Sequence, residues 1–154
     1  MKRLMAALAL CLVAACQTTT APTQVSAAAN LTGSFVTDLN AFRAEQGRGT
    51  VSENPKLRRA AQLHAEDMRA RGYFSHRSPG GPQGETMTQR IATSGCRPGA
   101  SAENIAQGQT SEASVFSAWR NSAGHRRNML GARYTEYGLG RSGNTWVLLF
   151  SSGC

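Results

Sequence analysis

The sequence predicts one domain of the α+β class, with helices ahead of a small sheet near the C-terminus. Apolar residues repeat with helical spacing in residues 34–46, where Phe35, Leu39 and Phe42 fall on one face. Two short stretches, 137–141 and 145–151, flank Ser142-Gly143-Asn144, which is a typical hairpin turn sequence. The chain has 154 residues, and residues 31–154 suffice for a single core but not for two catalytic domains.

Capping residues, glycine stops and apolar spacing predict the remaining elements. Asn54 followed by Pro55 starts a helix that Gly72 ends. The apolar stripe of this helix consists of Leu57, Ala61, His64 and Met68. Residues 73–84 are rich in glycine, serine and proline and form a loop. After this loop we expect a helix over 85–93, a strand over 102–106, and helices over 111–121 and 123–130.

Residues 1–15 are predicted to be a lipoprotein signal peptide. Lys2 and Arg3 precede an apolar run, Leu4 to Ala15, that is too short to span a membrane. The run ends in Leu-Val-Ala-Ala before Cys16 and so resembles the lipobox, at which a bacterial cysteine is diacylated and becomes the first residue. An ordinary secretory signal with an incidental cysteine is the alternative. Residues 16–30 then comprise the lipidated cysteine and an uncharged, flexible linker.

These features predict an exported bacterial lipoprotein on the periplasmic face of the cell envelope, held at the outer membrane by its lipid. The cysteines agree with an oxidising compartment. Once Cys11 leaves with the signal and Cys16 carries lipid, Cys96 and Cys154 remain and are expected to form a disulfide. Two free thiols are the alternative, and the absence of a Cys-x-x-Cys spacing argues against a structural metal site.

Basic residues are spread along the chain rather than clustered. The net charge is +8, and loss of Lys2 and Arg3 leaves 15 basic and 9 acidic residues, or +6. Nucleic-acid-binding proteins usually show clustered basic residues with interleaved aromatics, so we expect no nucleic-acid partner. The basic surface suits contact with anionic envelope material.

Two of the three histidines have no evident packing role. His64 lies on the apolar stripe of a predicted helix, which favours a half-buried, hydrogen-bonded side chain. His76 lies in the polar loop and His125 follows Gly124 at a helix junction, and loops are where functional residues accumulate. Two loop histidines alone are weak evidence for a site.

The motifs around these histidines follow one another in a fixed order. They are Phe74-Ser75-His76-Arg77-Ser78-Pro79, then Ala102-Glu103-Asn104-Ile105-Ala106, then Trp119 to Leu130 with its Gly124-His125 pair, preceded by His64 to Met68 and followed by Tyr137-Gly138-Leu139-Gly140. Together they resemble the CAP superfamily (cysteine-rich secretory proteins, antigen 5 and pathogenesis-related proteins), specifically its short bacterial SCP-like branch. The resemblance covers about residues 35–150.

The resemblance implies that residues 31–154 form an α-β-α sandwich, with a small antiparallel sheet between helical layers and a cleft where histidines and glutamates converge. On the matching motifs, His76 and His125 are candidate metal ligands, and Glu103 is the hypothetical catalytic base or the orienter of a histidine. The implied cofactor is a divalent metal, most simply zinc. Many eukaryotic members carry a second glutamate where this chain has Ser122. Two imidazoles are fewer than the three ligands usual for catalytic zinc, so unless Glu103 coordinates directly we expect a weak, exchangeable ion or none. The alternative for these three residues is a hydrogen-bonded network that holds the loops to the sheet.

Three functions remain open at this stage, and enzymatic activity is undecided. The first is a monomeric, lipid-anchored envelope module that binds a small apolar or envelope ligand. The second is a divalent-metal-dependent hydrolase of peptides or cell-wall material, and the third is an interaction domain that uses the arginine-rich surface. A serine hydrolase is disfavoured because no serine near the motifs stands in a Gly-x-Ser-x-Gly elbow. The serines concerned are Ser75, Ser78, Ser101 and Ser122.

Overall fold

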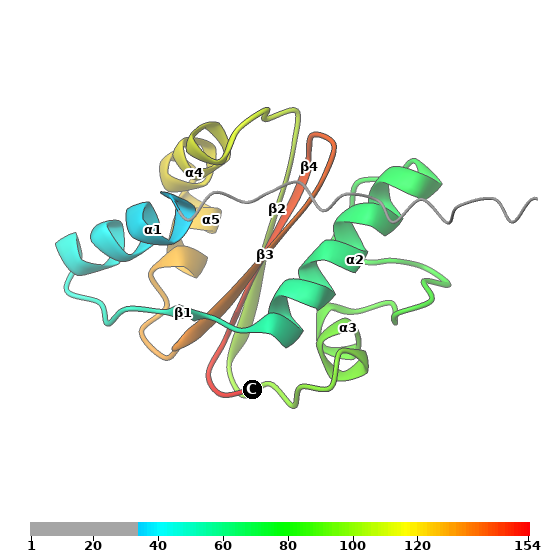
Figure 1. The fold of residues 1–154 in the computed structure, drawn as a ribbon, viewed down its shortest axis with the longest axis horizontal. Coiled ribbons are helices and arrows are strands. Elements are labelled where there is room, and N and C mark those ends of the chain that lie inside the picture. Colours follow the sequence, from blue (N-terminus) through cyan, green and yellow to red (C-terminus); the bar gives the residue numbers. More distant parts are fainter. Residues whose placement is uncertain (1–33) are drawn as a thin grey trace, which may run out of the picture.

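The computed structural model describes residues 34–154, which form five helices and four strands (Figure 1). The predicted signal peptide, Cys16 and the linker lie outside the described residues. Within residues 34–154, no helix combines the length and the apolar character needed to cross a bilayer. In chain order the elements are α1 (Ser34–Glu45), β1 (Ser52–Glu53), α2 (Pro55–Arg71), α3 (Met87–Thr93), β2 (Ser101–Gln107), α4 (Glu112–Asn121), α5 (Ala123–Met129), β3 (Glu136–Ser142) and β4 (Thr145–Ser151).

The sheet has the strand order β1-β3-β4-β2. The predicted hairpin is confirmed, since β3 pairs antiparallel with β4 from Glu136↔Ser151 to Ser142↔Thr145. Strand β2 pairs antiparallel with the other side of β4 and forms one edge of the sheet. The two-residue β1 joins β3 in parallel at the opposite edge, and it is too short for any sequence pattern to predict.

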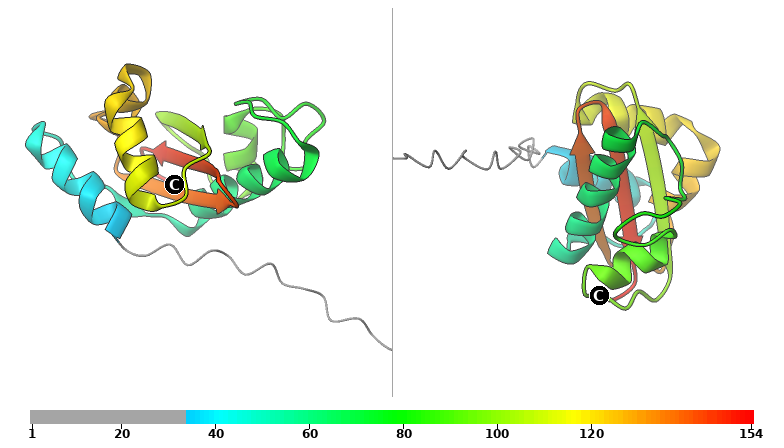
Figure 2. Two further views of the ribbon diagram at one scale, coloured as in Figure 1. Left: turned by 90° about the horizontal axis from the view of Figure 1, so that it is seen from above. Right: turned by 90° about the vertical axis from the view of Figure 1, so that its right-hand side faces the viewer.

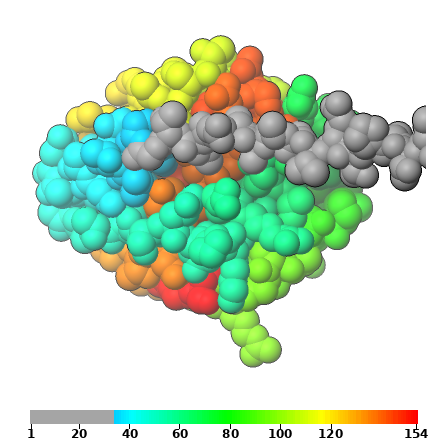
Figure 3. Space-filling model, viewed as in Figure 1, coloured from blue at the N-terminus to red at the C-terminus, as the bar shows by residue number. Residues whose placement is uncertain are grey.

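The sheet lies between two helical layers, as the family resemblance implies. Alternate residues of β4 point to opposite faces. Trp146, Leu148 and Phe150 pack in the core with α1, α4 and α5, whereas Val147 and Leu149 pack in the core with α2. Figures 1 and 2 show these helices on the two sides of the sheet. In the space-filling view of Figure 3, α1 and α2 occupy the surface and part of β3 is visible between them.

Local capping sets where the helices begin and end. The side chain of Asn54 accepts from the N–H groups of Lys56 and Leu57 at the start of α2, and Gly72 closes that helix in the left-handed conformation. Helix α3 begins two residues later than predicted. Thr86 and Gln89 form a reciprocal capping box there, so the helix starts at Met87.

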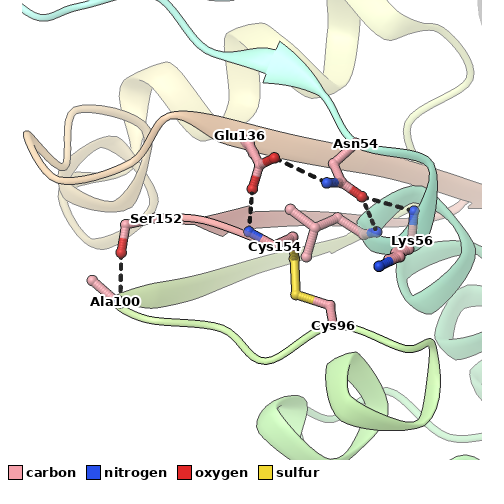
Figure 4. The surroundings of a disulfide bond; sticks show 8 residues. Asn54, Lys56, Cys96, Ala100, Glu136, Ser152 and Cys154 are labelled. Atoms are coloured by element: carbon pink, nitrogen blue, oxygen red, sulfur yellow. Dashed lines mark hydrogen bonds between the residues drawn. A yellow bond between two sulfur atoms is a disulfide. The ribbon is translucent and has the colours of Figure 1, made fainter.

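The predicted disulfide between Cys96 and Cys154 is confirmed, with the two Cα atoms 5.0 Å apart (Figure 4). Cys96 is buried in the core on the α2 side of the sheet. The bond therefore fastens the connection between α3 and β2 to the end of the segment that follows β4.

Candidate functional site

The Glu103-Asn104 pair lies on the edge strand β2 and contacts both helical layers. Neighbouring residues of a strand point to opposite faces of the sheet. The carboxylate of Glu103 reaches α3 and the loop after α2. The side chain of Asn104 points the other way, donating to the carbonyl of His125 at 3.1 Å and accepting from Asn128 at 2.8 Å, both on α5. This edge therefore brings the loop of His76 and the helix of His125 to the same strand.

His76 and Glu103, which are 27 residues apart in sequence, form a direct pair. Nδ1 of His76 lies 2.8 Å from Oε1 of Glu103. The side chain of Glu103 is 3% exposed, whereas that of His76 is 57% exposed. The hydrogen bond to Glu103 raises the pKa of His76, in opposition to partial burial, which lowers it. An ionised carboxylate can only accept hydrogen bonds, so Nδ1 of His76 carries the proton that is donated to Glu103. The other ring nitrogen, Nε2, can then form a hydrogen bond with an external partner.

Arg90 on α3 is the site residue that the sequence reasoning missed. Its Nη2 donates to Oε2 of Glu103 at 2.7 Å, and both side chains are almost fully buried. Both oxygens of the carboxylate are therefore engaged, one by a cation and one by an imidazole. The only indication available from the sequence is that a buried carboxylate such as that of Glu103 requires a charged or hydrogen-bonding partner. Nothing in the pattern indicated which arginine supplies it.

His125 lies on α5, half-buried, and interacts with His76 electrostatically. Burial lowers the pKa of His125, and the positive charge of His76 lowers it further. The ring of His125 has no hydrogen-bond partner among the described residues, whereas its carbonyl is held by Asn104.

Few side-chain atoms around His76 and His125 are free to coordinate a divalent metal. Among residues 34–154, no three His, Cys, Asp or Glu side chains gather closely enough to hold an ion. Glu103 is occupied by Arg90 and His76, so the remaining candidates are Nε2 of His76 and the ring of His125. Two imidazoles without a carboxylate fit catalytic zinc poorly.

His64 is not part of the exposed pair. It is fully buried on α2, more so than predicted, and its Nε2 donates to the carbonyl of Ser75 at 3.1 Å. Burial lowers the pKa of His64, which favours the neutral ring. This residue holds the loop immediately before His76.

The serines near the motifs do not form a nucleophile–histidine pair. The hydroxyl of Ser78 is buried between Asp67 and Arg71. The hydroxyl of Ser75 accepts from the N–H of Arg77. In the described part of the chain, no serine hydroxyl makes a hydrogen bond to a histidine ring.

Comparison with known proteins identifies the family. Residues 36–150 match the model of the CAP, or cysteine-rich secretory protein, family. The uncharacterized protein YkwD of Bacillus subtilis is 36% identical over 135 residues, which cover 86% of this chain and 50% of YkwD. The uncharacterized membrane protein YlbC of the same organism is 29% identical over 101 residues, covering 66% of this chain and 28% of YlbC. The chain thus spans half or less of the curated relatives it matches.

Solved structures share the fold. An extracellular protein with an SCP domain from Bacillus anthracis superposes with a TM-score of 0.71 at 24% identity, over 77% of this chain and 39% of that one. An outer surface protein from Borrelia burgdorferi gives 0.66 at 19% identity, over 77% of this chain and 90% of that one. The family model and the sequence relatives together show that this chain belongs to the cysteine-rich secretory protein (CAP) family.

Proposed function

We propose that this chain is an exported module of the bacterial cell envelope that binds a small ligand at the exposed ring of His76. Its family is described as secretory, one structural neighbour as extracellular and another as an outer surface protein. A disulfide in the domain suits an oxidising compartment. These observations support export, and the predicted lipobox at Cys16 supports an anchor at the membrane.

The orientation of the His76 ring carries the binding proposal. A buried carboxylate lies 2.8 Å from Nδ1, while more than half of the surface of the His76 side chain is exposed. Nε2 is thereby fixed as the ligand-facing atom. It accepts a hydrogen bond when the ring is neutral and donates one when the ring is protonated.

Glu103 serves this site as an orienting group. A general base needs a free oxygen within hydrogen-bonding distance of the proton that it removes. Both oxygens of Glu103 are already engaged, and the side chain is buried. The basic atom that faces outward is Nε2 of His76.

Phe74 provides an apolar contact for the ligand beside His76. It lies two residues before His76 and, among residues 34–154, is the one large hydrophobic side chain that is exposed, at 45%. A ligand that combines an apolar group with a polar atom contacts both residues, the first through Phe74 and the second through Nε2 of His76.

The dye 1-anilinonaphthalene-8-sulfonate, which combines apolar aromatic rings with an anionic sulfonate, tests the binding proposal on the full chain. Saturable fluorescence enhancement is expected for the wild type, with at least a several-fold weaker response for Phe74→Ser and for His76→Ala. Arg133→Ser changes an exposed residue in the loop before β3 and should leave the response unchanged. Equal dye binding by all four proteins would refute the proposed site.

A hydrolase is the second candidate, because an imidazole oriented by a carboxylate is also the arrangement of a general base. Its test is release of dye from labelled cell-wall material and from labelled casein, with and without added zinc. Turnover by the wild type that His76→Ala abolishes would favour the hydrolase over the binding module. Equal rates for the two proteins are expected if the chain only binds.

Zinc is proposed to bind weakly, through His76 and His125 alone. In competition with a chromogenic chelator of micromolar affinity, zinc is expected to remain on the chelator. Stoichiometric capture that either His76→Ala or His125→Ala removes would show a third ligand in the site and contradict this proposal.

Lipid anchoring is tested by metabolic labelling with radioactive palmitate. The full chain is expected to carry label and to sediment with membranes, and Cys16→Ala should lose both properties. Cys11→Ala lies within the predicted signal and should retain them. Label that persists in Cys16→Ala would place the modification elsewhere and remove the basis for the anchor.

A further inference from the structure

The loop that carries His76 connects α2 to α3 through 15 residues, 72–86, and two buried side chains hold it at adjacent peptide groups. Nε2 of His64 donates to the carbonyl of Ser75 at 3.1 Å. Nη2 of Arg90 donates to the carbonyl of His76 at 3.1 Å. One anchor comes from α2 and the other from α3, so the backbone at His76 is fixed relative to both helices.

Arg90 also fixes the group that holds the His76 ring. The same Nη2 donates to Oε2 of Glu103 at 2.7 Å, and Nη1 donates to the carbonyl of Glu85 at 3.1 Å. Its side chain is 2% exposed. A single guanidinium therefore holds the backbone of His76, the carboxylate on its ring and the far end of the loop.

We propose that Arg90 is the positioning residue of the His76 site: it sets both the place of the loop backbone and the oxygen that Glu103 offers to Nδ1. This inference rests on the proposed function, since it concerns the ring that faces the ligand. A planar guanidinium meets several acceptors in fixed directions, whereas the ammonium of lysine is a compact charge on a flexible stem. Arg90→Lys thus keeps the charge beside Glu103 and loses the simultaneous contacts.

A separate network anchors the same loop without contacting His76. Asp67 accepts from Arg71 through both oxygens, at 2.7 and 2.6 Å, and from Tyr73 and Ser78. If Arg90 only stabilised the loop, weakening this network would affect His76 in the same way. Ser78→Ala is therefore a matched control for loop anchoring. Arg43→Lys is a control for loss of a buried arginine, because Arg43 is fully buried and donates to the carbonyls of Met129 and Gly131 at the end of α5.

The test is the tautomer of His76, read from its ring ¹⁵N signals in the labelled full chain at a pH where the ring is neutral. The wild type, Ser78→Ala and Arg43→Lys are expected to show one species with the proton on Nδ1. Arg90→Lys is expected to lose that preference and to populate the Nε2–H form that free histidine favours. A folded Arg90→Lys protein with the wild-type tautomer would overturn the proposal.

Wild-type protein provides a second reading that does not depend on a variant folding. A guanidinium held at both Nη atoms rotates slowly, so the Nη protons of Arg90 should appear as separate, slowly exchanging signals. A single averaged signal would overturn the proposal.

Both measurements, of the His76 tautomer and of the Arg90 guanidinium signals, are made without ligand. Dye binding that is insensitive to His76→Ala would therefore refute the proposed function, while the tautomer and the guanidinium signals would still decide the role of Arg90.

Discussion

The carboxylate of Glu103 accepts hydrogen bonds from the buried guanidinium of Arg90 and from the exposed ring of His76. Arg90 balances the negative charge of this carboxylate through Oε2 inside the protein, and His76 is bound to Oε1 nearer the surface. The two buried charges depend on each other, because an unpaired charge in the interior is costly. The residue that orients the site is thus also a stability determinant, and the two effects can be measured separately.

Glu103→Gln is expected to lower the free energy of unfolding by about 3–5 kcal/mol, since it leaves Arg90 without its counter-charge. It should also lower the pKa of His76 toward its ordinary value of 6.5, because the hydrogen bond that raises it is weakened. Urea unfolding and an NMR titration of the ring measure the two effects. Glu45→Gln removes an exposed carboxylate on α1 that is paired with Arg120 and should change neither quantity.

The pH dependence of this pair has a definite sign. The folded-state pKa of His76 is raised, so its contribution to stability is fully present below pH 6.5 and is lost as the pH rises through the raised value. In Glu103→Gln that decline should be smaller. An identical His76 pKa in wild type and variant would contradict the assigned cause.

Asp67 gives the opposite pH dependence. Hydrogen bonds from Arg71, Ser78 and Tyr73 hold the pKa of Asp67 well below its ordinary value of 3.8, against the smaller effect of burial. Its stabilising contribution is therefore present above that value and is lost as the pH falls toward the depressed one. Asp67→Asn should be less stable than wild type by about 1–3 kcal/mol at pH 7.

In thermal unfolding the gap between the two proteins should narrow as the pH falls below 3.8, where Asp67 protonates in the unfolded chain but is still ionised in the folded one. Asp38→Asn removes an exposed carboxylate on α1 and should follow the wild type throughout. A gap between wild type and Asp67→Asn that stays constant down to pH 2 would show that the loop does not depend on this charge.

At the scale of elements, the packing of α2 on β3 depends on two glycines. A Cβ on Gly138 would lie 2.2 Å from the backbone nitrogen of Arg58, and one on Gly140 would lie 2.3 Å from that of Gln62. Backbone atoms cannot rotate away as side chains do. The helix that supplies His64 and begins the His76 loop therefore sits directly against the strand.

Gly138→Ala is expected to lower the free energy of unfolding by about 1–3 kcal/mol or more, because α2 must shift away from the sheet. Urea unfolding measures this loss. Gly49→Ala is the matched control, since a Cβ at Gly49 meets nothing within 4 Å. Equal stability of the two variants would mean that α2 moves outward without cost.

Sequence patterns predict elements whose determinants are local. The start of α2 follows from Asn54-Pro55 and its end from Gly72, and both are confirmed. The start of α3 was placed two residues early, although the Thr86–Gln89 spacing of a capping box was visible in the sequence. Strand β1 was missed because its two residues pair only through the distant β3.

The sequence predicts those residues of the candidate site that lie within recognisable motifs. His76 and Glu103 lie in separate motifs, and the structure brings them together. Arg90 was not predictable, because its role depends on the tertiary contact between α3 and β2. An arginine on a short helix is read as a solvated residue unless a buried carboxylate is known to face it.

For the whole molecule, the edge strand of the sheet is covered by helices. The carbonyl of Ile105 accepts from the indole N–H of Trp119, and the carbonyl of Glu103 accepts from Asn128. Side chains from α4 and α5 thus occupy positions where another strand would pair. This arrangement disfavours sheet extension by a second copy at the same edge that positions the site.

The disulfide joins the α2 side of the molecule to the end of the segment after β4, and its contribution to stability belongs to the whole fold. The backbone N–H of Cys154 donates to Glu136, whose other oxygen accepts from Asn54, the capping residue of α2 (Figure 4). Cys96 follows α3, which carries Arg90. The bond and this carboxylate therefore connect α2, α3 and β3.

Cys96→Ser and Cys154→Ser are each expected to lower the free energy of unfolding by about 4 kcal/mol, because the bond closes a separation of 58 residues in the unfolded chain. Urea unfolding with and without dithiothreitol measures this. Reduced wild type should match both variants, and dithiothreitol should leave the variants unchanged. Wild-type stability that is insensitive to the reductant would mean that the noncovalent contacts through Glu136 already restrain the chain as fully as the covalent bond does.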